Sequence, residues 1–124
     1  MKELVVVAIG GNSIIKDNAS QSIEHQAEAV KAVADTVLEM LASDYDIVLT
    51  HGNGPQVGRI VLASEAAKNV TPAMPFDVCG AMSQGYIGYH IQQAMGNALR
   101  ARGIDKPVAT VATQIVVDSN DKGF

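Results

Sequence analysis

The amino-acid sequence predicts an α/β domain with a mainly parallel sheet. Residues 4–9 and 47–50 are short apolar runs rich in valine and isoleucine. Such runs, apolar on both faces, are typical of central strands in a parallel sheet. A longer segment with helical spacing follows each run. The order strand, helix, strand, helix indicates an α/β fold.

The segment after the first strand predicts a long amphipathic helix. Its apolar residues recur at intervals of four and three, and they therefore form one stripe: Ile23, Ala27, Val30, Ala34, Val37 and Leu41. Ser20 or Ser22 can cap the start of this helix. Residues 56–67 have the composition of a second helix.

A third helix is predicted from about residue 76 to residue 102, just before Gly103. It contains four glycines, which together cost about 4 kcal/mol relative to alanine: Gly80, Gly85, Gly88 and Gly96. We therefore expect another backbone to pack closely against this helix, and a kinked or broken helix is the alternative. Residues 108–117 then predict a third strand, and residues 118–123 a turn-rich tail.

Composition excludes several classes of partner. The 124 residues fit one domain, with a net charge of −4 and nine lysines and arginines scattered singly. This pattern gives no electrostatic footprint for nucleic acid or for an anionic membrane. The apolar runs have strand length and no secretory signal is recognisable, so a cytoplasmic location is expected. The lone Cys79 cannot form an internal disulfide, and we expect a packed thiol.

Two glycine-bearing loops directly follow the two strands. Gly10, Gly11 and Asn12 follow the first strand, and residues 51–58 follow the second. Because the carboxyl ends of neighbouring parallel strands meet at one edge of a sheet, we expect these loops to converge. Bare backbone N–H groups and helix amino termini would then surround a small anion, and phosphate is the anion we expect. The alternative for the paired glycines is a tight turn.

Other interpretations of the second loop fit less well. An Asn-Gly pair is also a hairpin signal, but residues 57–62 do not alternate as a return strand would, and Pro55 suits the first turn of a helix. No Walker motif is present. Gly52, Gly54 and Gly58 are spaced one residue wider than the dinucleotide fingerprint. A Rossmann or Walker nucleotide site is therefore not expected.

The histidines and the acidic tail predict little chemistry. His25 has no second ligand at metal spacing and His90 lies among apolar helix residues, so no metal site is predicted. His51 is expected to orient its loop as a hydrogen-bond donor. Asp118 and Asp121 fit a solvated turn. No catalytic residue can be assigned within the chain.

Several motifs together resemble carbamate kinases of the amino acid kinase superfamily. They occupy residues 8–12, 50–58, 83–89, 113–118 and 120–121, in the family's order and across nearly the whole chain. The stretch around the second loop is highly distinctive. Kinases acting on acetylglutamate or isopentenyl phosphate lack this sequence motif.

The resemblance implies a three-layer αβα sandwich with a mainly parallel sheet, assembled as a homodimer. It also implies phosphoryl transfer between carbamoyl phosphate and ADP, giving ATP and carbamate, a step of arginine fermentation, with Mg2+ as the nucleotide's metal. Six residues would bind carbamate or carbamoyl phosphate: Gly10, Gly11, Asn12, Gly52, Asn53 and Gly54.

Residues 1–124 resemble only the amino-terminal, substrate-binding domain of such an enzyme. The wider superfamily often has a lysine in the first loop region, but Ala8 stands two residues before Gly10, as in carbamate kinases. In family members the phosphate-neutralising lysines and the main nucleotide site lie beyond the position of Phe124. We therefore expect this polypeptide alone to be inactive. The alternative is a non-catalytic ligand-binding or dimerisation module that keeps the glycine loops.

Overall fold

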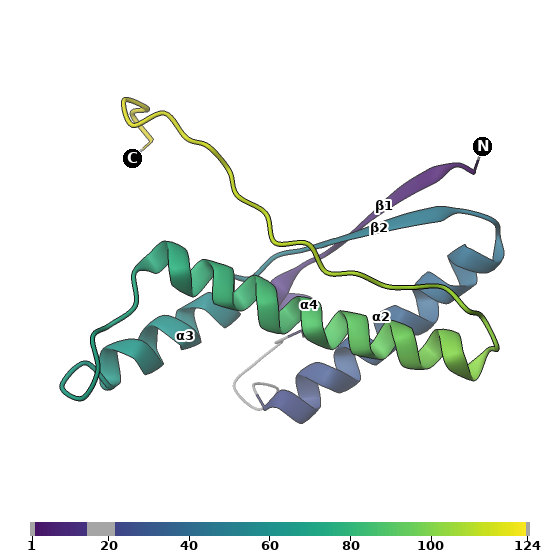
Figure 1. Cartoon of the computed structure of the whole chain (residues 1–124), viewed down its shortest axis with the longest axis horizontal. Helices are drawn as coiled ribbons and strands as arrows, with labels where there is room; N and C mark the ends of the chain where they lie inside the picture. The colour runs from purple at the N-terminus through teal and green to yellow at the C-terminus, as the bar shows by residue number, and fades with distance from the viewer. Residues whose placement is uncertain (1, 15–21, 124) are drawn as a thin grey trace.

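The computed structural model describes residues 2–14 and 22–123, with only the backbone of Asn12 and Ile23. Six elements follow one another: β1 (Leu4–Ile9), α1 (Gly11–Ile14), α2 (Ile23–Ala42), β2 (Asp46–His51), α3 (Gly54–Ala66) and α4 (Phe76–Ala101). Figure 1 shows both strands above α2 and α4. Two of the three predicted strands and all three predicted helices are therefore present, and the one-turn helix α1 is an addition.

The two strands pair in parallel, with Leu4 opposite Asp46 at one end and Ile9 opposite His51 at the other. Residues on one face of this sheet turn toward the helices, and Ile9 is only 7% exposed. Residues on the opposite face remain open, including Val6 at 62% exposed and Val48 at 45%. The α/β class and its parallel sheet are confirmed, and the described helices cover one face of that sheet.

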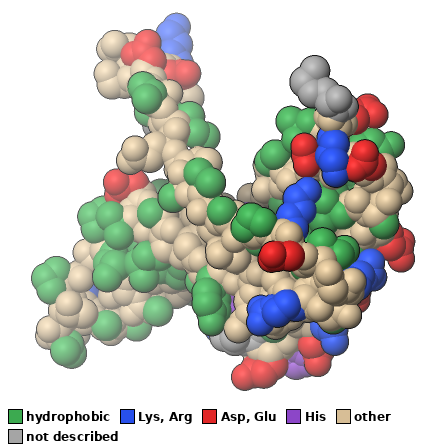
Figure 2. Space-filling view, turned by 45° about the vertical axis from the view of Figure 1, so that its right-hand side comes forward, with side chains coloured by type: hydrophobic (Ala, Val, Ile, Leu, Met, Phe, Trp, Pro, Cys, Tyr) green, Lys and Arg blue, Asp and Glu red, His purple; other side chains and the backbone are tan. Residues whose placement is uncertain are grey.

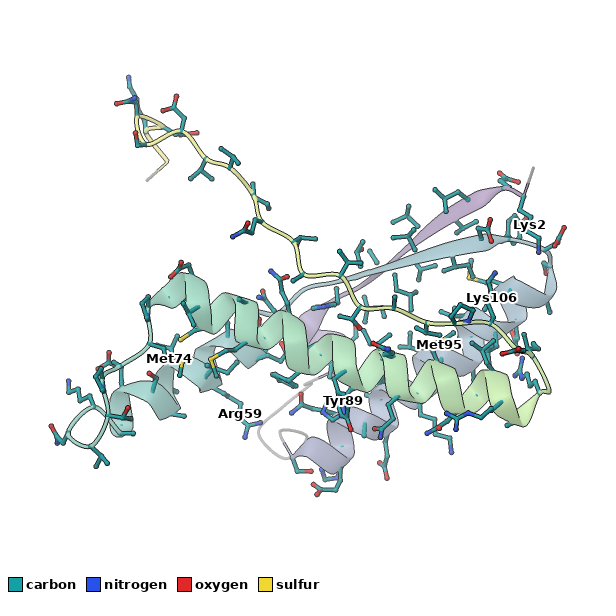
Figure 3. The ribbon with its side chains drawn as sticks, in the orientation of Figure 1. Lys2, Arg59, Met74, Tyr89, Met95 and Lys106 are labelled. Atoms are coloured by element: carbon teal, nitrogen blue, oxygen red, sulfur yellow. The ribbon has the colours of Figure 1, made fainter. Side chains whose placement is uncertain are left out.

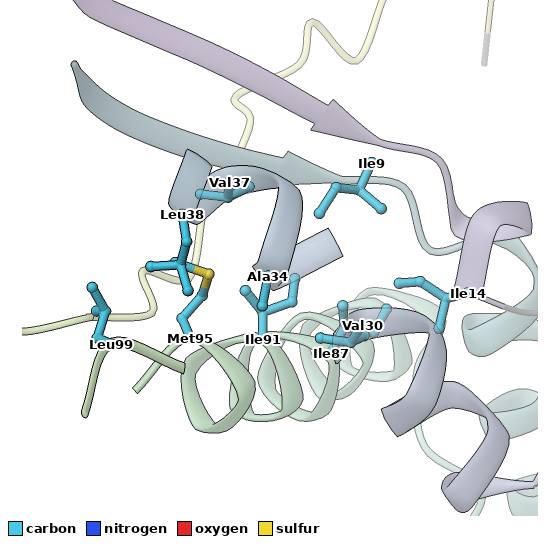
Figure 4. Close-up of a cluster of buried hydrophobic side chains, with 10 residues drawn as sticks. All are labelled: Ile9, Ile14, Val30, Ala34, Val37, Leu38, Ile87, Ile91, Met95 and Leu99. Carbon is cyan, nitrogen blue, oxygen red and sulfur yellow. The ribbon is translucent and has the colours of Figure 1, made fainter. Parts of the chain in front are cut away.

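The core lies between the sheet, α2 and α4. Its buried members, drawn in Figure 4, are Ile9, Ile14, Val30, Ala34, Val37, Leu38, Ile87, Ile91, Met95 and Leu99. The stripe predicted for the long helix supplies Val30, Ala34 and Val37. Ser22 caps α2, because its Oγ accepts the backbone N–H of His25 at 3.3 Å. Ser20 lies outside the described residues.

Helix α4 is continuous over 26 residues. Close packing explains only Gly88, where a Cβ would lie 2.2 Å from Cγ2 of Thr110. Around Gly80 and Gly85 there is nothing within 4 Å of such an atom. The close neighbour is therefore a side chain of the segment after the helix rather than the expected backbone, and it meets one glycine of the four. Cys79 is fully buried, as expected for a packed thiol.

The prediction of a third strand over residues 108–117 is wrong. This segment is extended but joins no sheet, and a cavity of about 570 Å³ lies between it and β2. Hydrogen bonds to α4 hold it instead: the Gln84 side chain bonds both backbone groups of Thr113, and the Thr110 hydroxyl donates to the Gly88 carbonyl. The β-branched pattern reports a preference for extended backbone, whereas a strand also needs a neighbouring strand.

The segment after α4 projects from the rest of the molecule at its far end. Figure 2 shows hydrophobic side chains along it, and Val116 is 99% exposed. Its near end is tied to β2 by an ion pair between Lys106 and Asp46, with Nζ and Oδ1 3.3 Å apart (Figure 3). In the described part of the chain, no helix is long and apolar enough to span a membrane.

The contact between Gly88 and Thr110 gives a first prediction. Replacing Gly88 with alanine should displace residues 108–113 from α4 and lower the free energy of unfolding by about 1–3 kcal/mol, because the new methyl group overlaps Thr110. Urea unfolding measures the loss, and hydrogen exchange at the Thr113 N–H reports the displacement. Adding Thr110→Ser, which removes Cγ2, should restore part of the stability.

The matched control is Gly85→Ala on the same helix. Its Cβ meets nothing within 4 Å, so the substitution should stabilise the protein by up to about 1 kcal/mol through helix propensity alone. Equal effects of the two substitutions would contradict the role assigned to the Thr110 contact.

Candidate functional site

Each strand ends in a glycine-bearing loop that starts a helix. After β1, the Gly10 carbonyl accepts the Ser13 N–H at 2.9 Å, and α1 begins at Gly11. After β2, Gly52 and Asn53 lead into α3, whose first turn contains a proline and no acidic side chain. Both predicted loops therefore aim a helix amino terminus at the same edge of the sheet.

The two loops are in direct contact. The Gly52 N–H donates to the Ile9 carbonyl at 2.8 Å, which extends the strand pairing by one residue. A Cβ on Gly52 would lie 3.1 Å from the nitrogen of Gly11, and a Cβ on Gly11 would lie 3.2 Å from the nitrogen of Asn53. Both distances are tighter than nine in ten real Cβ contacts, so a Cβ on either glycine would push the neighbouring backbone away by a few tenths of an ångström. Glycine avoids this displacement and lets the two backbones approach closely.

The remaining predicted binding residues sit at the margins of this contact. Gly10 and Gly54 are both exposed, and a Cβ on Gly54 would meet nothing within 4 Å. The backbone of Asn12 lies in α1, and its side chain is not described. Of the six predicted residues, the structure brings Gly11, Gly52 and Asn53 into contact and places the others beside them.

Helix α4 anchors the side chain of Asn53. Its Nδ2 donates to Oγ of Ser83 at 2.8 Å, and that hydroxyl donates to the Gly80 carbonyl at 2.6 Å. Ser83 is fully buried. Asn53 makes no side-chain cap for α3, so its amide is committed to α4. Ser83 was not predicted as a site residue, although its position in a motif shared with carbamate kinases was a usable signal.

Gln56 connects the start of α3 to the first loop. The side chain is fully buried, and its Nε2 donates to the Gly11 carbonyl at 3.3 Å. Within the described residues its Oε1 finds no hydrogen-bond donor. Gln56 was not predicted as a site residue, because a polar residue early in a helix is ordinarily solvated.

His51 contacts its own loop, as expected. Its Nδ1 lies 3.1 Å from the Gly52 carbonyl oxygen, and the N–H tautomer donates there. Residues 9–14 and 51–58 contain no lysine or arginine, so the loops offer neutral donors and helix dipoles. No group of three or more His, Cys, Asp or Glu in the described residues could hold a metal ion.

The charge of Arg59, which follows the second loop, affects Tyr86 on α4. Burial raises the pKa of Tyr86, and the charge of Arg59 opposes that shift. The phenol donates to Oε1 of Gln26 at 3.0 Å, which ties α4 to α2. Figure 3 shows Arg59 at the side of α3. The arrangement can therefore bind a small anion through backbone N–H groups, with its formal neutralisation left to groups outside the two loops.

The model of the amino acid kinase family matches residues 3–122, and the chain therefore belongs to this family. It is 69% identical to the carbamate kinase-like protein YahI of Escherichia coli K12 and 48% identical to the carbamate kinase of Pyrococcus horikoshii. Both alignments cover 100% of this chain and 40% of the relative.

The structure of Giardia carbamate kinase is also similar. The TM-score is 0.95 at 41% identity, and the match covers 100% of this chain and 42% of that chain. The resemblance to carbamate kinases predicted from the motifs is thus confirmed. The chain spans about 40% of the length of the curated relatives it matches.

The anchoring of Asn53 gives a second prediction. Ser83→Ala should lower the free energy of unfolding by about 1–3 kcal/mol, because it leaves the Asn53 amide without its buried partner. Urea unfolding measures this loss. As a control, Ser43→Ala at the exposed end of α2 should change stability by no more than about 0.5 kcal/mol. Similar losses for both serines would contradict the anchoring role.

Proposed function

We propose that this chain forms the carbamate and carbamoyl phosphate site of a carbamate kinase. The observation that carries the proposal is the contact between two glycine loops at the carboxyl ends of paired parallel strands. Family membership and the carbamate kinase names of the relatives support it. The ligand residues we propose are Gly10, Gly11, Asn12, Gly52, Asn53 and Gly54.

The geometry suits phosphoryl transfer because that reaction needs positioning and charge stabilisation more than covalent chemistry from the protein. Backbone N–H groups at the starts of α1 and α3 have no intrahelical partners and can donate to phosphoryl oxygens. The positive end of the 13-residue α3 adds a favourable potential for an anion. In this proposal, the loops orient the phosphoryl group and the carbamoyl moiety.

The other components of the reaction belong to the same proposal. Residues 1–124 serve as the substrate-binding domain, and ATP or ADP with Mg2+ binds to a nucleotide domain outside them. We further propose a homodimer that works in the cytoplasm, in arginine metabolism. The amino acid kinase family assignment supports a nucleotide substrate in general terms.

Titration with carbamoyl phosphate tests the site directly. In a 15N-labelled sample of the chain, the amides of Gly11, Asn12, Asn53 and Gly54 should shift with one shared binding curve, because they surround one ligand. The amide of Gly103, beyond the far end of α4, serves as the control and should not move. Unchanged amides in both loops at millimolar ligand would overturn the proposed site.

Turnover distinguishes the proposed enzyme half from a complete catalyst. We expect the purified 124-residue chain to form no ATP from ADP and carbamoyl phosphate, because the proposal places the nucleotide pocket and the neutralising lysines outside this chain. A coupled ATP assay measures this, with the Pyrococcus horikoshii carbamate kinase as the positive control. ATP formation above the background rate would contradict the proposed division of the site.

A further inference from the structure

We infer that Gln56 is a positioning residue that sets the direction of the Asn12 N–H in the first loop. This inference rests on the proposed function, since the Asn12 N–H matters as a donor to the bound anion. Gln56 belongs to the second loop's helix, yet its hydrogen bond reaches a residue 45 positions earlier in the chain. It therefore links the two halves of the site.

The peptide plane between Gly11 and Asn12 determines where the Asn12 N–H points. In a planar trans peptide, the carbonyl of one residue and the N–H of the next point in opposite directions, and the described backbone contains no cis peptide. Nε2 of Gln56 holds the Gly11 carbonyl from the buried side. The Asn12 N–H must then point away from Gln56, out of the buried interior.

The Asn12 N–H is the donor that this peptide plane directs. Asn12 is the second residue of α1, where a backbone N–H has no partner within the helix. Such an N–H needs a partner outside the helix, and a bound anion can supply one. Without the Gln56 bond, the peptide plane would lose a contact that holds its carbonyl on the buried side.

The side-chain oxygen of Gln56 is buried and has no hydrogen-bond donor among the described residues. Burying an amide oxygen without a donor is unfavourable, and an apolar side chain of similar size would fill the same space without that penalty. The benefit of an amide here therefore lies in the bond from Nε2 to Gly11. A Cβ on Gly11 would lie 3.1 Å from Oε1, so the glycine and the glutamine are fitted to each other.

The experiment compares Gln56→Leu with wild type, using sulfate as the probe. Leucine is similar in size to glutamine but has no donor. Sulfate should therefore bind at least tenfold more weakly, while the chain stays as stable as wild type. The amide shifts of the loops report binding, and urea unfolding reports stability. Binding of sulfate within twofold of wild type by Gln56→Leu would overturn the inference.

Gln84→Leu is the matched control. Gln84 also uses its amide to bond backbone, at Thr113, but it acts on the segment after α4. Its loss should leave sulfate binding within twofold of wild type. If both variants weaken sulfate binding equally, Gln56 has no specific positioning role.

A second variant, Gln56→Glu, adds a pH readout that a merely structural role would not produce. A protonated carboxyl can donate to the Gly11 carbonyl, whereas a carboxylate can only repel it. Sulfate binding relative to wild type should therefore be retained at low pH and lost as pH rises. Sulfate keeps its charge over this range. His51, Arg59 and Glu65 are the titratable or charged groups of the second loop and α3, and the ratio to wild type at each pH removes the effects that both proteins share. A ratio of Gln56→Glu binding to wild-type binding that does not change with pH would overturn the inference. This test also works if Gln56→Leu fails to fold.

A ligand-free measurement separates this inference from the proposed function. If wild type binds neither sulfate nor carbamoyl phosphate, the proposed site fails. The inference is then judged by the 13C shift of the Gly11 carbonyl and by hydrogen exchange of the Asn12 amide. Both should change in Gln56→Leu and remain unchanged in Gln84→Leu. No change in either would overturn the inference.

Discussion

The contact between the backbones of Gly11 and Gly52 is the constraint on which the candidate site depends. The hydrogen bond from Gly52 to Ile9 continues the parallel pairing past the strand ends and forces the two loops together. At that separation a side chain on either glycine would press against backbone nitrogen. The loops can therefore present N–H groups from two strands to one small ligand because neither glycine carries a Cβ.

Hydrogen bonds from buried polar side chains connect these loops to the core helices. Ser83, which anchors Asn53, lies one helical turn before the core residue Ile87 on α4. Gln56 acts from α3 in the same way on the first loop. Because α4 also packs on α2 through the hydrophobic core, the loop geometry is fixed by the same burial that stabilises the fold. Contacts from helices α3 and α4 thus position the site, in addition to contacts within the loops.

The sequence was sufficient wherever the governing interaction was local or directly patterned. Apolar runs predicted β1 and β2 because such runs are typical of strands in a parallel sheet, and glycines placed after both runs predicted the convergence of the loops. The stripe from Ile23 to Leu41 predicted α2, because helical spacing determines which residues share a face.

The wrong prediction of a third strand and the unpredicted site residues involve interactions that no local pattern encodes. Residues 108–117 carry a strand pattern, but α4 holds them away from β2 through Gln84 and Thr110. Ser83 and Gln56 are polar residues on helices, and only the tertiary arrangement makes them buried. A sequence pattern reports a residue's own preference, whereas these three outcomes depend on which distant group it meets.

The absence of lysine and arginine from residues 9–14 and 51–58 bears on how the proposed site would work. Neutral N–H donors hold a phosphoryl group in a defined orientation without binding its charge tightly in the ground state. An interaction accelerates a reaction only if it is stronger in the transition state than in the ground state. Under the proposed function, a neutral cradle leaves the strongest electrostatic interactions to cations outside the loops, where they can act as charge develops during transfer. Strict loop geometry and the lack of loop charge are then complementary requirements of one design.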